Sequence, residues 1–113
     1  MAYLLRFSEA FEADVEGLFD WLFGRDLATA FRFRDSVTAA TASLVHFPTA
    51  NTVVEESALY KRTVRRKLFC SGTTAYRLLY TVYEAGEQEE DAVIYVLRVM
   101  HGAARPILDA DNE

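Results

Sequence analysis

The sequence has few of the residues that build covalent or metal crosslinks. Its 113 residues include one cysteine, Cys70, and two histidines, His46 and His101, which are far apart. One thiol cannot form an internal disulfide, and these three side chains lack the spacing of a zinc site. The sequence also has no phosphate-binding glycine loop. We therefore expect no disulfide, no metal ion and no cofactor.

Long apolar stretches are also missing. No run approaches the ~20 residues of a transmembrane helix. The segment from Met1 to Ser8 lacks the charged start and apolar stretch of a signal peptide. We therefore expect a cytoplasmic protein without membrane contact. The length predicts a single domain over residues 1–113, and a hydrophobic content of 51% with 26% charged residues is typical of globular proteins.

Positive charge is scarce overall but concentrated in one stretch. The formal net charge is −5, yet residues 61–83 contain six basic residues and no acidic one. Residues 84–92 contain five acidic residues and no basic one. Cations along a strand edge commonly serve only to prevent edge-to-edge pairing. We favour a functional explanation, because such a run is unusual in an acidic protein and suits a negatively charged partner.

Two amphipathic helices are predicted after a short strand over Tyr3–Phe7. Ser8 can cap the first helix and Gly24 can end it, while Asp26 can cap the second. Apolar residues recur at helical spacing in the first helix: Phe11, Val15, Leu18 and Leu22. A similar stripe precedes Pro48 in the second: Phe33, Val37, Ala40, Leu44 and Phe47. The connection of about three residues predicts an antiparallel helical hairpin.

Aromatic residues in these helices are more numerous than one apolar stripe can bury. Phe19, Trp21 and Phe23 follow each other at alternate positions of the first helix. We therefore expect some of them to lie in an apolar surface patch. Such a patch marks partner binding or self-association.

The second half of the sequence predicts three strands after a connecting loop over residues 50–60. They are Arg62–Cys70, Thr74–Glu84 and Ala92–Met100. The last is almost continuously apolar, as expected for a central strand buried on both faces. The order β-α-α-β-β-β predicts an α+β fold, with the helical hairpin packed on one face of a mainly antiparallel four-stranded sheet.

Three segments of this half carry a resemblance to a known family. They are the arginine-rich strand from Arg62 to Phe69, the segment Tyr76-Arg-Leu-Leu-Tyr80, and the segment Val96-Leu-Arg-Val-Met-His-Gly-Ala-Ala-Arg105. In this order and spacing, they resemble the RelE/ParE superfamily of toxins, also called plasmid-stabilisation proteins. The N-terminal strand and hairpin are similar to the same family, so the resemblance covers nearly the whole chain.

The resemblance implies the toxin of a bacterial type II toxin–antitoxin system, which arrests growth until a cognate antitoxin neutralises it. ParE-like members inhibit DNA gyrase, whereas RelE-like members cleave mRNA on the ribosome. The basic stretch could serve RNA, a gyrase surface or an acidic part of the antitoxin. The expected assembly is a homodimer or a hetero-oligomer with the antitoxin.

For a RelE-like member, the resemblance implies catalysis without a metal. Cleavage then needs a base for the ribose hydroxyl, cations for the developing negative charge, and an acid for the leaving oxygen. The candidate residues are Arg65, Lys67, Arg77, His101 and Arg105.

Strand periodicity makes part of this site plausible. Arg65 and Lys67 share one face of their strand. Arg77 looks outward onto a free sheet face if its neighbours Tyr76 and Leu78 pack on the helices, and adjacent strands then bring the three cations together. In the alternative interpretation Arg77 pairs with a carboxylate, and His101 ends its strand with a hydrogen bond to a loop.

The acidic net charge favours the gyrase inhibitor, because a nuclease of the ribosomal A site must enter a polyanionic cleft. The long helical hairpin also resembles that of ParE-like members. The alternative is a ribosome-dependent mRNA endoribonuclease. The sequence leaves open whether the chain is an enzyme.

Overall fold

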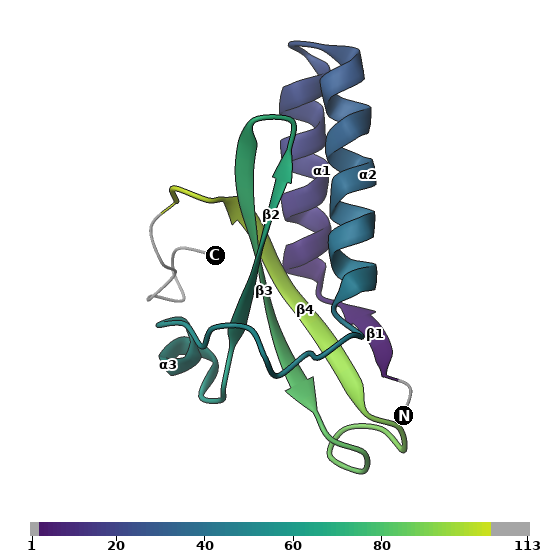
Figure 1. Cartoon of the computed structure of the whole chain (residues 1–113), viewed down its shortest axis with the longest axis vertical. Coiled ribbons are helices and arrows are strands. Elements are labelled where there is room, and N and C mark those ends of the chain that lie inside the picture. Colours follow the sequence, from purple (N-terminus) through teal and green to yellow (C-terminus); the bar gives the residue numbers. More distant parts are fainter. Residues whose placement is uncertain (1–2, 105–113) are drawn as a thin grey trace.

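The computed structural model describes residues 3–104 of the chain. Its elements are β1 (Leu4–Phe7), α1 (Glu9–Phe23), α2 (Leu27–Ser43), α3 (Ser57–Tyr60), β2 (Arg65–Ser71), β3 (Thr74–Tyr83) and β4 (Val93–His101). The helices α1 and α2 stand side by side against one face of the sheet, and their common end extends beyond it (Figure 1). Within the described residues, no helix is long and apolar enough to cross a membrane.

The four strands form one sheet in the order β1-β4-β3-β2. β2, β3 and β4 form an antiparallel meander, while β1 lies parallel to β4. The expected α+β fold is thereby confirmed, and β4 is the central apolar strand that the sequence predicted. The sheet is mixed rather than purely antiparallel, because β1 and β4 run in the same direction.

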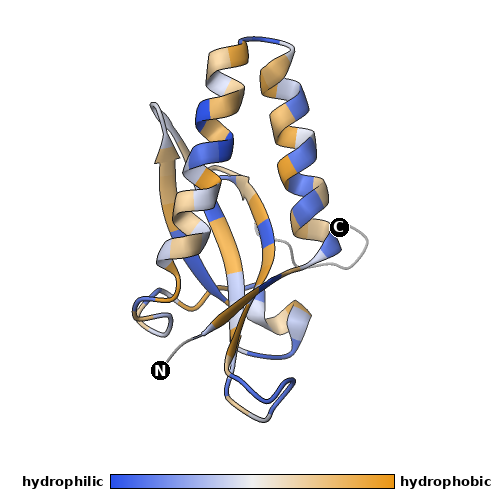
Figure 2. Ribbon diagram, turned by 90° about the vertical axis from the view of Figure 1, so that its right-hand side faces the viewer, coloured by the Kyte–Doolittle hydropathy of each residue, from blue (hydrophilic) through white to orange (hydrophobic). Residues whose placement is uncertain are grey.

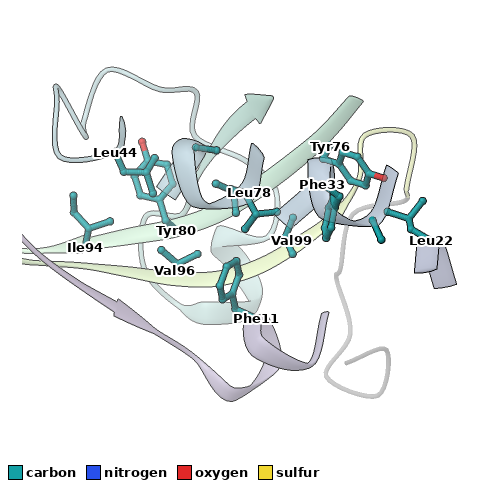
Figure 3. Packing of buried hydrophobic residues seen from close by; sticks show 13 residues of the cluster. Phe11, Leu22, Phe33, Leu44, Tyr76, Leu78, Tyr80, Ile94, Val96 and Val99 are labelled. Carbon is teal, nitrogen blue, oxygen red and sulfur yellow. The ribbon is translucent and has the colours of Figure 1, made fainter. Parts of the chain in front are cut away.

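The core lies between the sheet and the helical hairpin. Tyr76, Leu78 and Tyr80 alternate along β3 toward the helices and are each at most 3% exposed. They meet Phe33 of α2, whose ring centroid lies 4.9 Å from that of Tyr76, and residues of β4 (Figure 3). Burying large side chains of this kind contributes roughly 1.5–3 kcal/mol each. This packing fixes which face of each strand looks toward the hairpin.

The hairpin begins as predicted but its second helix ends early. The Ser8 hydroxyl accepts a hydrogen bond from the backbone N–H of Phe11 at 3.0 Å, which caps α1. The structure corrects the expected stripe of the second helix at Phe47, which lies beyond α2, has a φ of 55° and is 82% exposed. α2 ends at Ser43, with Leu44 as its C-cap, so Phe47 lies in the turn that leads to Pro48 and cannot continue the helical stripe.

The segment expected to be a plain loop over residues 50–60 contains α3 and one β-bridge, between Val53 and Arg65. The predicted strand start at Arg62 was also wrong, since β2 begins at Arg65. Arg62 instead stacks over the ring of Tyr83 at 3.8 Å and donates a hydrogen bond to Thr81. Residues 52–54 lie along the outer edge of β2, and the chain then passes to the sheet face opposite the hairpin, where α3 lies (Figure 1).

An ion pair joins α1 to the second half of β4, beyond the part that pairs with β1. Arg98 donates from Nε and Nη2 to the carboxylate of Asp14 at 2.6 and 2.8 Å, and Asp14 also accepts from the backbone N–H of Val99. The β3–β4 register skips Leu97, so a bulge turns this part of β4 toward α1. Arg98 is thus largely buried and paired, although it lies among apolar residues of β4.

We predict that Asp14→Ala lowers the free energy of unfolding by about 2–4 kcal/mol, because it leaves a largely buried arginine without its carboxylate. Urea denaturation of the purified protein measures this change. Asp35→Ala, at an exposed position of α2, is the control and should change stability by less than about 0.5 kcal/mol. Equal stability of the two variants would show that the Arg98–Asp14 pair does not hold α1 on the sheet.

Candidate functional site

The candidate cations are divided between the two faces of the sheet. In the register of β2 and β3, Arg65 pairs with Tyr80 and Lys67 with Leu78, so both cations share the hairpin side with these core residues. Arg77 pairs with Leu68 and points to the other side. The expectation that Arg65, Lys67 and Arg77 come together was therefore wrong. Strand alternation places Arg77 on the opposite face from Arg65 and Lys67, because Arg77 lies between the two core residues Tyr76 and Leu78.

Arg77 does not look onto a free sheet face, which corrects a second expectation. Its side chain is 7% exposed and forms an ion pair of 3.2 Å with Glu56, whose side chain is 1% exposed. Its other terminal nitrogen donates to the carbonyl of Ala104 at 3.0 Å. The segment that precedes α3 covers Arg77 and supplies the carboxylate. The structure thus shows the carboxylate-paired arrangement that the sequence offered as the alternative.

Arg65 is held by the segment that follows Pro48. It donates to the carbonyl of Asn51 at 2.7 Å, and the amide of Asn51 donates to the hydroxyl of Tyr80 at 2.9 Å. That hydroxyl in turn donates to the carbonyl of Pro48. Burial raises the pKa of Tyr80, an effect that Asn51 and Arg65 oppose, so the hydroxyl remains a donor at neutral pH. Arg65 is therefore engaged in holding this segment. Of the two cations, Lys67 is the one more available to a partner.

A polar hollow lies at the outer edge of β2, where Arg66 and Lys67 adjoin Asn51 and Thr52. Its volume is about 240 Å³. Neither cation forms an ion pair with any carboxylate of residues 3–104. In a chain of net charge −5, two such neighbouring cations on a sheet edge form a positive surface that suits a negatively charged partner. We call these two residues the basic edge.

His101 ends β4 on the hairpin side and is exposed. Its ring stands edge-on to Tyr76 with the centroids 5.9 Å apart, and its Nδ1 accepts a hydrogen bond from Ala103 at 3.3 Å. Lys67 lies two strands across and two residues along the sheet from His101, about 12 Å by ordinary strand geometry. Arg105, the last candidate, lies outside the described residues.

Gly102 lets the chain after β4 pass close to the first residues of β3. Its N–H donates to the carbonyl of Ala75 at 2.8 Å, and a Cβ at this position would lie 3.1 Å from that oxygen. A side chain here would require the backbone at Ala75 to shift by a few tenths of an ångström. Gly102 of the C-terminal motif therefore has a packing role, whatever the role of His101.

The expected apolar surface patch is present at the free end of the hairpin. Trp21 is 60% exposed and Phe23 52%, whereas Phe19 is only partly buried. Leu27 and Phe31 of α2 extend the patch, and the Phe31 ring lies edge-on to Phe19 at 5.5 Å. Hydrophobic and hydrophilic residues are interspersed along both helices in Figure 2, and the exposed fractions show that several of the apolar residues face solvent.

Sequence reasoning missed Glu56 and Asn51, the two residues that organise the candidate cations. Both stand in the segment over residues 50–60, which has no periodicity from which a face could be inferred. Their partners, Arg77 and Arg65, are respectively 21 and 14 positions away in the chain. One signal in the sequence could have pointed to Glu56. Arg77 stands between apolar residues of a central strand, and a buried arginine needs a carboxylate partner.

The comparisons with known proteins agree with this architecture. The family model described as the ParE toxin of type II toxin-antitoxin system, parDE, matches residues 5–106. No curated protein matches the chain.

We predict that Arg77→Ala lowers the free energy of unfolding by about 3–5 kcal/mol, because it strands the buried carboxylate of Glu56. The double variant Arg77→Met with Glu56→Leu should recover most of that loss, since it removes both charges and fills the space. Urea denaturation of the two variants and the wild type provides the comparison. A double variant no more stable than Arg77→Ala would show that the ion pair is not the reason for the loss.

Proposed function

Because the chain belongs to the ParE toxin family of type II toxin–antitoxin systems, we propose that it arrests growth by binding and inhibiting DNA gyrase. Membership of this family assigns the chain the role of toxin and implies a cognate antitoxin. The proposal concerns the target and the mode of action, which differ among toxins of this fold.

The observation that carries the proposal is the division of the candidate catalytic cations. A ribonuclease needs several cations and a proton-transfer group around one phosphate. Here Arg77 is buried against Glu56 on one face, and Arg65 is committed to Asn51 on the other. Inhibition by binding needs no convergent set, only a surface complementary to the target.

Two surfaces of the chain suit contact with a protein target. The apolar patch at the free end of the hairpin contains Trp21, whose ring is stacked by the guanidinium of Arg25 at 4.8 Å. Tryptophan and arginine are the residues most often found at the energetic centre of protein interfaces. The basic edge adds a positive surface that suits acidic side chains of gyrase or the phosphates of its bound DNA. We propose the basic edge as the primary contact.

The alternative function is ribosome-dependent cleavage of mRNA, and the exposure of His101 is the observation that favours it. The hydrogen bond from Ala103 engages Nδ1, which leaves Nε2 to exchange a proton with a substrate. In this alternative, Lys67 and Arg105 would supply positive charge to the same phosphate.

The first test is a supercoiling assay of DNA gyrase with purified, antitoxin-free toxin. Wild type should inhibit supercoiling, and Lys67→Glu should raise the inhibitory concentration at least about tenfold, or about 1.4 kcal/mol of binding. Lys61→Glu, the same substitution away from the basic edge, should inhibit like wild type. We choose Lys67 because replacing Arg65 would also disturb Asn51 and Tyr80. Toxic protein that leaves gyrase fully active would exclude this target.

His101→Ala distinguishes the two candidate functions. We expect growth arrest to persist unchanged, because a gyrase inhibitor needs no proton-transfer group. The measurement is growth after induction without antitoxin, with protein levels matched by immunoblot. Loss of arrest by at least about a hundredfold in surviving cells, from a variant that still binds antitoxin, would favour mRNA cleavage instead, since general acid–base catalysis contributes factors of that size.

A further inference from the structure

The outer edge of the sheet is only partly covered. β2 is the last strand in the order β1-β4-β3-β2, so its outer side can pair only with the segment that precedes it. The backbone N–H of Arg66 donates to the carbonyl of Thr52 at 3.0 Å, and the carbonyl of Val64 accepts from the N–H of Val54 at 2.9 Å. This short pairing covers the start of the edge and stops at Arg66.

The backbone of β2 is open beyond Arg66. In an antiparallel strand, the N–H and the carbonyl of one residue point to the same side, and successive residues alternate between the two sides. Because Arg66 points outward, Leu68 and Cys70 do so as well, whereas Phe69 points toward β3. Within residues 3–104, neither Leu68 nor Cys70 has a backbone hydrogen bond on the outer side. These two residues thus offer two donors and two acceptors to another strand.

The open stretch lacks the features that keep a sheet edge from pairing. Natural edges are protected by charged side chains, prolines or bulges. Leu68, Phe69, Cys70 and Ser71 include no charge and no proline, and the register of β2 with β3 has no shift. Leu68 is 56% exposed, and Cys70 is also exposed. Where the edge is open, it is therefore regular, uncharged and accessible.

We propose that this open edge pairs with the same edge of a second copy of the chain. The two β2 strands run antiparallel about a two-fold axis at Phe69, with Leu68 of each copy opposite Cys70 of the other. Each of these two residue pairs exchanges two N–H···O bonds, so four hydrogen bonds join the two sheets into one. The proposal concerns the assembly of the toxin and does not depend on gyrase as the target.

The backbone of β2 selects this register among the antiparallel ones. A two-fold axis at Leu68 would place Cys70 opposite Arg66, whose N–H is already bonded to Thr52. An axis at Cys70 would place Leu68 opposite Gly72, which lies in the turn after β2 with a φ of 61°. An axis between these two positions uses outward-pointing residues that are open on both copies.

The charge pattern of the edge suits a second copy. Around this axis, Lys67 lies opposite the uncharged Ser71 of the other copy. The two Lys67 residues are four positions apart along the strands, about 13 Å, which exceeds the Debye length of about 8 Å at physiological salt. The side chains that meet across the axis are Phe69 with Phe69 and Leu68 with Cys70. The edge is thus complementary to itself, because it is uncharged at its centre and keeps like charges apart.

Cys70 is the only cysteine of the chain and reports this register directly. In the paired edges the two Cys70 residues are diagonal neighbours, with Cα atoms about 7–8 Å apart. A short bismaleimide should therefore crosslink the purified wild-type toxin into a dimer, and sedimentation should show the same dimer without the reagent. The control is Cys70→Ser with Glu90→Cys, which moves the thiol to the exposed loop after β3 and should give no crosslinked dimer.

Leu68→Pro tests the pairing of the backbone. Proline removes an N–H that makes no bond to β3, and an edge strand accepts proline at such a position. This variant should lose the dimer, whereas Leu68→Ala keeps the N–H and should retain it. If Leu68→Pro does not fold, Leu68→Lys provides the same test, because it places like charges on diagonal neighbours across the axis and should also lose the dimer.

A wild-type toxin that stays monomeric at high concentration and is not crosslinked would overturn the proposal. Equal crosslinking of wild type and of folded Leu68→Pro and Leu68→Lys would also overturn it. A monomeric wild type whose Leu68→Pro variant no longer inhibits gyrase would do so in favour of a strand supplied by the target. Failure of the proposed target gives a different result, namely a toxin that forms the dimer and leaves gyrase fully active.

Discussion

The period-two alternation of β3 is the constraint from which the other surfaces follow. Once Tyr76, Leu78 and Tyr80 are buried against the hairpin, Arg77 and Leu79 must point to the opposite face. The register with β2 then sends Lys67 to the hairpin side, and the buried Arg77 requires a carboxylate, which Glu56 supplies. A shift of one residue in this register would exchange every one of these environments. The core packing thus decides where positive charge can be presented.

The fold was largely predictable from the sequence because its signals are local. Helical stripes such as Phe11–Leu22, the cap at Ser8 and the apolar run of the last strand each depend on neighbouring residues, and each was confirmed. The site was less predictable because it depends on distant pairings. Asn51 and Glu56 reach their arginines through a segment without periodicity, so neither pairing leaves a local signal in the sequence.

The charge of the chain is arranged by element rather than spread evenly. All charged residues of α1 are acidic, and the loop after β3 is acidic too. The cations Arg66 and Lys67, which form no ion pair within residues 3–104, lie on the outer edge of β2. Such separation lets one small chain offer opposite charge to different partners. Surfaces of opposite charge therefore lie on different elements of the described chain.

The parallel pairing of β1 with β4 has a consequence for biosynthesis. Leu4 pairs with Val93, so the first strand finds its partner only when nearly the whole chain has left the ribosome. Contacts between residues this distant in the chain form slowly, whereas a helical hairpin forms from local contacts. The hairpin of α1 and α2 is therefore complete in sequence long before the sheet can close. Its sheet-facing apolar side chains lack their partners until β3 and β4 have been synthesised.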